Sequence, residues 1–143
     1  MSQRRLIFLL ILLSLSKILA QPQRHDRWLQ KTGYGLMFHY EAFKNHSTQS
    51  YNQVVNSFDV EKFASEVEST GAGHVIFVIG QHWGKYCAPN QAYEKLLGVP
   101  NGIWTSKRDL ILEIAQQLSK REIRLILYMT ARAPMRHYKI IKA

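Results

Sequence analysis

Cysteine is almost absent from this sequence of 143 residues, in which Cys87 is the only one. A chain with one cysteine cannot form an internal disulfide framework, so its fold must depend on a hydrophobic core. We expect Cys87 to be buried and unreactive, which is the commoner state of such a residue, or else to pair with another chain. Internal repeats and low-complexity segments are also lacking, and the length allows one domain.

Acidic residues are scarce, because 10 Asp and Glu stand against 19 Lys and Arg, a net charge of +9. The excess lies largely at the two ends: Arg4, Arg5 and Lys17 precede the main part of the chain, and four basic residues lie among the last dozen, with no acid. No zinc finger, RNA-binding signature or basic helix with interleaved aromatics is present. We therefore expect no nucleic-acid partner.

Long hydrophobic runs are absent except at the amino terminus. There, basic residues precede the apolar run Leu6–Leu13, and the small residue Ala20 ends the segment, which is the layout of a secretory signal. The run is shorter than the roughly 20 apolar residues that span a bilayer. We expect cleavage after Ala20, no membrane association afterwards, and secretion or delivery to a lysosomal or other endomembrane lumen. An uncleaved anchor is the alternative, and a sequon at Asn45 is consistent with a secreted loop.

The remaining chain alternates short apolar runs with helical patterns. Strands are predicted at 35–40, 74–80 and 124–130, and helices at 58–73 and 106–123. In the first helix Asp59 is placed to cap the start and Gly71 to end the helix. In the second, Ser106 and Asp109 have the spacing of a capping box.

The order β-α-β-α-β defines an α/β fold with a parallel sheet. The second and third strands are apolar on both faces, which predicts that both faces are covered. A (β/α)8 barrel and a doubly wound open sheet both fit. Long loops after the strands, at 41–58 and 80–105, and short ones after the helices favour a partial barrel containing strands 1–3 and helices 1–2. The first strand is followed by no glycine-rich phosphate loop.

Polar and aromatic side chains lie at or just after the carboxyl end of each predicted strand. They are His39 and Tyr40, then Gln81, His82 and Trp83, then Tyr128, Thr130 and Arg132. Sugars bind to such mixtures, because hydroxyls need fixed donors and acceptors while C–H faces pack on aromatic rings. Structural roles are the alternative for each residue, and Trp83 could cap the core. His39 and His82 could bind a metal, but no third ligand with suitable spacing is evident, so we expect neither metal nor cofactor.

Other loop residues are expected to be structural or solvated. Tyr86, Cys87 and Pro89 are predicted to pack the second loop against the body of the protein. Glu41 and Glu94 lie in the two long loops and are expected to be solvated charges. A catalytic role at the mouth of the sheet is the alternative for each. His74 is expected at a surface or helix edge.

Taken together, these segments resemble the α-L-fucosidase family of glycoside hydrolases. GLMFHYEAF (35–43) resembles the family's first strand, and FDVEKFASEVESTGAGHVIFV (58–78) is similar to its first helix and second strand. GQHWGKYCAP (80–89) stands where the family has a His-His-Asp motif, and KRDLILEIAQQLSKREIRLILYMT (107–130) is similar to the next helix and strand. The resemblance extends over about Trp28 to Pro134.

The resemblance implies a sugar site at His39, Gln81, His82 and Trp83. In the family, the histidine of the first strand and the histidine pair after the second strand bind sugar hydroxyls. His39 and His82 match two of these histidines, Gln81 replaces the first histidine of the pair, and Trp83 replaces the aspartate. A glutamine side chain can still donate and accept hydrogen bonds.

Hydrolysis by this family retains configuration and needs two carboxylates about 5–5.5 Å apart. The resemblance implies that the nucleophile is an aspartate at the end of a fourth strand, and this sequence ends soon after the third. We therefore expect a signal peptide (1–20), the amino-terminal part of a glycosidase barrel (21–134) and a basic tail (135–143).

The predicted function is that of a secreted α-L-fucosidase-like glycoside hydrolase, acting on terminal fucosyl or related bonds, as a fragment without the nucleophile. Whether the chain is itself an enzyme is left open. The alternatives are a non-catalytic secreted glycan-binding protein and an inactive truncated remnant. The predicted partner is a carbohydrate, and the oligomeric state is not indicated.

Overall fold

A computed structural model describes residues 27–41, 48–81 and 84–130. The predicted signal peptide, Asn45, His82, Trp83, Arg132 and the tail 135–143 lie outside these residues. The chain divides into two units at Lys31 and Thr32. In the first unit the described part is the short helix α2 (Arg27–Lys31), and everything below concerns the second. No helix among the described residues is long and apolar enough to span a membrane.

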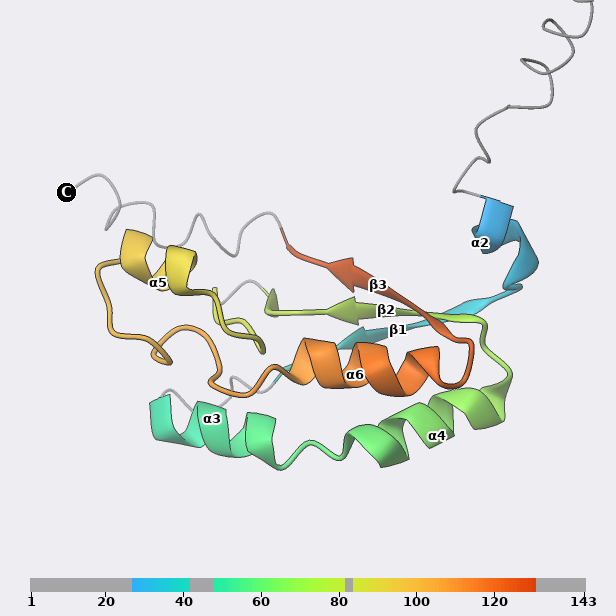
Figure 1. The fold of residues 1–143 in the computed structure, drawn as a ribbon, viewed down its shortest axis with the longest axis horizontal. Coiled ribbons are helices and arrows are strands. Elements are labelled where there is room, and N and C mark those ends of the chain that lie inside the picture. Colours follow the sequence, from blue (N-terminus) through green and yellow to red (C-terminus); the bar gives the residue numbers. More distant parts are fainter. Residues whose placement is uncertain (1–26, 42–47, 82–83, 131–143) are drawn as a thin grey trace, which may run out of the picture. The chain divides into compact units, whose positions relative to one another are not determined.

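The second unit contains one parallel sheet of three strands in the order β1-β2-β3 (Figure 1). The strands are β1 (Gly35–His39), β2 (His74–Val78) and β3 (Arg124–Tyr128). Their register places His39 beside Val78, and Val78 beside Tyr128. All three strands were predicted from the sequence, and the α/β class with a parallel sheet is confirmed.

Helix α4 (Val60–Thr70) forms where the apolar spacing predicts it. The Asp59 carboxylate accepts a hydrogen bond from the Lys62 N–H at 2.9 Å, which caps the first turn. Gly71 ends the helix with φ 78°, a left-handed conformation that glycine adopts without steric cost. The predicted stripe is fully buried and faces the sheet: Val60, Phe63, Ala64 and Val67.

Helix α6 (Leu110–Ser119) begins later than the capping-box spacing indicated. Asp109 is the N-cap and accepts from the Leu112 N–H at 2.9 Å. The Ser106 hydroxyl instead donates to the Arg108 carbonyl at 2.6 Å, so the prediction that Ser106 caps the helix was wrong. Leu110, Ile114 and Leu118 are buried toward the sheet and α4.

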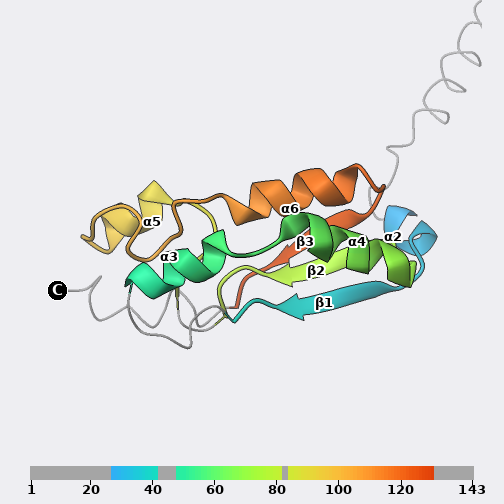
Figure 2. The same cartoon turned by 90° about the horizontal axis from the view of Figure 1, so that it is seen from below.

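Both long loops contain a helix that the sequence pattern did not reveal. These are α3 (Thr48–Asn56) and α5 (Gln91–Leu96). Figures 1 and 2 show both lying beyond the carboxyl ends of the strands, while α4 and α6 lie along one face of the sheet. The end of the sheet predicted to carry the site is therefore also the end where the added helices gather.

The other face of the sheet is less covered by the described residues than the sequence predicted. Val75 and Phe77 of β2 are buried against α4 and α6, and Val78 is also buried. On the other face Met37 of β1 is 48% exposed and Tyr128 of β3 is 45% exposed. Leu127 of β3 is in register with Phe77 and so lies on the helix face, where it is 49% exposed. The prediction that both faces are covered is therefore confirmed for the central strand β2 and wrong for β3. Strand β3 lies at the edge of the sheet and has a described neighbouring strand on one side only.

Candidate functional site

The carboxyl ends of the three strands are joined by two short side-chain contacts. The Gln81 amide nitrogen lies 2.6 Å from Nδ1 of His39, which links the ends of β2 and β1. The Thr130 hydroxyl donates to the Gln81 carbonyl at 2.6 Å, which links the ends of β3 and β2. The predicted site residues His39 and Gln81 are therefore brought together, with Gln81 in the centre.

The contact between Gln81 and His39 selects one form of the imidazole. An amide nitrogen donates and does not accept, so Nδ1 of His39 accepts in this contact. In a neutral imidazole the other nitrogen, Nε2, then carries the proton. Because the His39 side chain is exposed, its ring offers a fixed N–H donor at the mouth of the sheet.

Gln81 adopts an unusual backbone conformation. Its φ is 34°, in the left-handed region that residues with a side chain rarely occupy, and its side chain is 8% exposed. The preceding Gly80 has no room for a side chain, because a Cβ there would lie 2.3 Å from the Lys85 carbonyl. Such strain is tolerated where the surroundings determine the conformation, often at functional sites.

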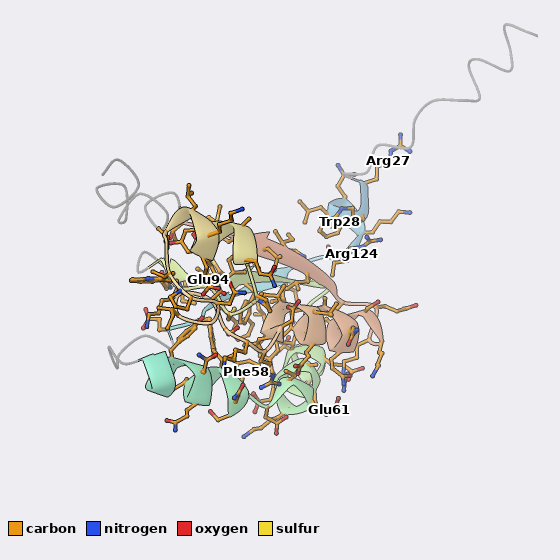
Figure 3. The ribbon with its side chains drawn as sticks, turned by 60° about the vertical axis from the view of Figure 1, so that its left-hand side comes forward. Arg27, Trp28, Phe58, Glu61, Glu94 and Arg124 are labelled. Carbon is orange, nitrogen blue, oxygen red and sulfur yellow. The ribbon has the colours of Figure 1, made fainter. Side chains whose placement is uncertain are left out.

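Tyr40 does not belong to this group, contrary to the prediction. Side chains alternate along a strand, so Tyr40 faces opposite to His39 and enters the core. Its ring lies 5.6 Å from that of Phe77 and 5.7 Å from that of Phe58, which Figure 3 shows in the connection between α3 and α4. Burial raises the pKa of the Tyr40 hydroxyl well above its ordinary value, so it remains protonated at all physiological pH values.

The loop after β2 packs on the domain through its aromatic and sulfur side chains. Tyr86 and Cys87 are buried as predicted, whereas Pro89 is exposed and does not contribute. The Cys87 thiol donates to the Ile79 carbonyl at 3.4 Å, and burial raises its pKa to about 12. The expectation of an unreactive buried cysteine agrees with this environment.

Glu94 is buried, which overturns the expectation of a solvated loop charge. It is 1% exposed, and Figure 3 shows it on the inner side of α5. Its carboxylate accepts hydrogen bonds at 2.9–3.0 Å from the backbone N–H groups of Gly102, Trp104 and Thr105. These contacts close the loop on α5, and the carboxylate acts as a structural anchor.

The pKa of Glu94 reflects two opposing effects. Burial raises the pKa. The backbone N–H groups of Gly102, Thr105 and Trp104 favour the charged form, and together they lower the pKa by more than burial raises it. The net direction is below the ordinary value. Glu94 is therefore ionised, and its oxygens already accept hydrogen bonds from backbone N–H groups. Such a carboxylate is unsuited to general acid catalysis, which needs a protonated group that can reach the substrate.

The residues KRD at 107–109 all have structural contacts. The Lys107 N–H donates to the Asn52 side chain at 3.1 Å, and Asp109 caps α6. Arg108 bonds both carboxylate oxygens of Glu113 at 2.6 and 2.9 Å. Its third nitrogen reaches the carbonyls of residues 55, 56 and 58 at 2.8–3.0 Å. This motif therefore fastens α6 to the end of α3.

Two further features were not predicted from the sequence, one at the amino end of β2 and one in the loop after it. His74 is buried rather than at a surface, with Nδ1 3.1 Å from the Thr32 hydroxyl. The Lys85 ammonium lies over the rings of both Tyr51 and Trp104. Neither feature had a signal in the local sequence, because the partners lie 19 to 42 residues away along the chain. Among the described residues, no group of three side chains could bind a metal ion.

The fold belongs to the parallel α/β class, and it is similar to solved structures of α-L-fucosidases. An α-L-fucosidase GH29 from Bacteroides thetaiotaomicron aligns over 80% of this chain with a TM-score of 0.58 and 14% identity. The α-fucosidase of Thermotoga maritima, solved with fucose, aligns over 73% with a TM-score of 0.54 and 16% identity. An α-L-fucosidase isoenzyme 1 from Paenibacillus thiaminolyticus aligns over 80%, with a TM-score of 0.54 and 15% identity.

The chain spans about a third of the length of these enzymes, 31% to 34%. No protein-family profile and no curated protein matches the sequence. The resemblance inferred from the motifs is therefore confirmed as a likeness of fold: three parallel strands and their helices are arranged as in part of an α-L-fucosidase. At these identities the likeness concerns the fold and leaves the roles of individual residues as predictions.

Proposed function

We propose that this chain binds a terminal fucosyl or closely related sugar, as part of an α-L-fucosidase-like glycoside hydrolase. The observation that carries the proposal is the contact of Gln81 with His39 at the carboxyl end of the sheet. In parallel α/β folds that end of the sheet is where ligands bind. The likeness to fucosidase structures, one of them solved with fucose, supports the choice of sugar.

The chemistry of the pair suits a sugar hydroxyl. His39 offers an Nε2–H donor whose orientation is fixed by Gln81, so little conformational entropy is lost when a hydroxyl binds. His82 and Trp83, which follow Gln81 directly, remain the predicted second donor and aromatic platform. Both lie outside the described residues.

Hydrolysis needs two carboxylates with free oxygens near the sugar. Glu94 does not qualify, because backbone N–H groups occupy its oxygens. Glu41 is exposed and directly follows Tyr40 at the end of β1. The described residues therefore support sugar binding more directly than catalysis, and a non-catalytic glycan-binding role is the second candidate.

We also propose that the chain enters the secretory pathway, with 1–20 as the signal, 21–134 as the folded region and 135–143 as a basic tail. Expression in a secreting host, followed by amino-terminal sequencing, should give a chain beginning at Gln21. The Asn45→Gln variant should lose a mass increment that a deglycosylating enzyme removes from the wild type. A retained leader or an unmodified Asn45 would refute the corresponding part.

The binding proposal is tested by calorimetric titration of the full chain with L-fucose. Gln81→Ala should lower the affinity about tenfold, because one hydrogen bond and the fixed ring orientation are lost. Gln116→Ala, which changes an exposed glutamine of α6, is the matched control and should have no effect. Equal affinities for the two variants, or no binding by the wild type, would refute the proposal.

Release of 4-nitrophenol from its α-L-fucoside separates the two candidates. Turnover that depends on His39 would make the chain an enzyme. Fucose binding without turnover would favour the non-catalytic glycan-binding role.

A further inference from the structure

Lys85 is an unusual cation in the described part of the chain. Among the Lys and Arg side chains described there, only Lys85, Arg108 and Arg121 are not exposed. Arg108 pairs with Glu113, and Arg121 pairs with Glu61, which lies on the outer surface of α4 (Figure 3), and with Glu68. For Lys85 no carboxylate partner is found among the described residues. It is therefore the one partly buried ammonium or guanidinium there whose charge is not balanced.

The acidic residues of the chain are nearly all accounted for. Every Asp and Glu except Asp26 lies in the described residues. Most have another role there, as helix caps, ion pairs or the loop anchor: Asp59, Asp109, Glu61, Glu66, Glu68, Glu113 and Glu94. The segments 42–47, 82–83 and 131–143 contain no acid. No Asp or Glu side chain of these three segments could therefore neutralise Lys85.

Two aromatic rings hold the Lys85 ammonium in place. Its nitrogen lies 5.3 Å from the centre of the Tyr51 ring and 5.6 Å from the centre of the Trp104 ring. Such contacts orient and stabilise a cation but leave its full charge. Burial also lowers the pKa of Lys85, which indicates that the surroundings do not compensate the charge.

The backbone of Lys85 lies next to Gln81 of the proposed sugar site. Its backbone carbonyl packs against Gly80, the residue before Gln81. The following residue, Tyr86, pairs with Thr105, and the Tyr86 N–H donates to the Trp104 carbonyl at 3.0 Å. Lys85 therefore belongs to the same group of loops at the carboxyl end of the sheet.

We propose that Lys85 binds an anionic group of the glycan, a sulfate ester or a carboxylate, in a subsite beside the His39–Gln81 pair. An ammonium that is partly desolvated and pre-oriented forms a strong charge-assisted hydrogen bond with such an anion. Trp104, which is half-buried, offers an aromatic surface for the adjoining sugar ring. The inference rests on the sugar-binding function proposed above and specifies its ligand as acidic.

The test compares neutral and acidic sugars by calorimetric titration of the full chain. The probes are L-fucose, fucose 4-sulfate, methyl glucuronide and inorganic sulfate. The wild type should bind fucose 4-sulfate about tenfold more tightly than fucose, and 0.5 M salt should reduce that advantage. Lys85→Met should abolish the advantage and leave the affinity for fucose unchanged, whereas Lys85→Arg should keep most of it.

Lys95→Met is the matched control, because Lys95 is exposed on α5; it should behave as the wild type.

Failure of fucose itself to bind would count against the proposed function. Normal fucose binding with no gain from the sulfate, or an equal gain in Lys85→Met, would overturn the Lys85 inference alone. Inorganic sulfate binding as tightly as the sulfated sugar would also overturn it, since the site would then not recognise a glycan. Methyl glucuronide binding that depends on Lys85 would extend the site to carboxylates, and binding that does not would restrict it to sulfate. If Lys85→Met does not fold, two other results test the inference. An advantage of fucose 4-sulfate that salt does not reduce, or that Lys85→Arg loses, would overturn it.

Discussion

The side-chain nitrogen of Gln81 lies 2.6 Å from Nδ1 of His39 and thereby joins the carboxyl ends of β2 and β1. The contact requires that Nδ1 accepts and that Nε2 carries the imidazole proton. A residue of strand β1 is thus oriented by a residue that follows β2. This arrangement would leave His39 with one fixed donor, which is testable without any ligand.

Nitrogen-15 NMR of the imidazole rings should show His39 as the Nε2–H tautomer at neutral pH in the folded chain. In Gln81→Ala the two ring nitrogens of His39 should become more alike, because the tautomers then interconvert. His74, whose Nδ1 contacts Thr32, serves as the internal reference and should be unchanged. A proton on Nδ1 of His39 in the wild type would contradict this assignment.

Replacing Glu94 should weaken the fold substantially. Glu94→Gln keeps the shape but replaces a carboxylate that accepts from three backbone N–H groups with an amide, which accepts less strongly and adds a donor. We expect a loss of about 2–3 kcal/mol in the free energy of unfolding, measured in urea. Glu66→Gln, at an exposed glutamate with a 3.9 Å contact to Lys62, is the control and should change it by less than about 0.5 kcal/mol. Equal losses would show that the Glu94 carboxylate has no special role.

The contribution of Glu94 should also depend on pH. Its pKa in the folded chain lies below the ordinary value of 4.5, so the folded state binds its proton less readily than the unfolded state. The stabilisation is therefore complete above the unfolded pKa and is lost as the pH falls through the folded pKa. The difference in unfolding free energy between wild type and Glu94→Gln should be constant from pH 7 to 5 and shrink below about 4.5. A difference that grows on acidification would contradict this sign.

Arg108 should not be replaceable by lysine. A lysine has the charge but cannot bond both oxygens of Glu113 and three carbonyls together. We expect Arg108→Lys to lower the free energy of unfolding by about 2–3 kcal/mol. Arg121→Lys is the comparison, because Glu61 and Glu68 are well exposed and its effect should be clearly smaller. A larger effect at Arg121 would overturn the view that Arg108 fastens α6 to α3.

Cys87 should react very slowly with a thiol reagent in the folded chain. Burial raises its pKa to about 12, and it is the thiolate that reacts. At pH 8 the folded protein should therefore be modified far more slowly than the same protein in urea. Modification at equal rates in the two states would show that Cys87 is accessible.

Local pattern predicted the strands and the main helices because both have a periodic signal. The stripe in α4, the cap at Asp59 and the stop at Gly71 agree with the structure. Helices α3 and α5 were missed since they are short and weakly apolar, and their contacts come from distant segments. Ser106 had the spacing of a cap, but its hydroxyl is satisfied locally by the Arg108 carbonyl, so Asp109 begins the helix.

The sequence by itself determined the α/β class and the positions of its strands, because hydrophobic periodicity depends on neighbours along the chain. It also placed His39 and Gln81 at strand ends. The tertiary structure decided which of the polar residues meet: Gln81 with His39, Glu94 with the amides of Gly102, Trp104 and Thr105, and Lys85 with two rings. Such contacts join residues far apart in sequence, so burial and charge at these sites are set only when the strands and loops have packed together.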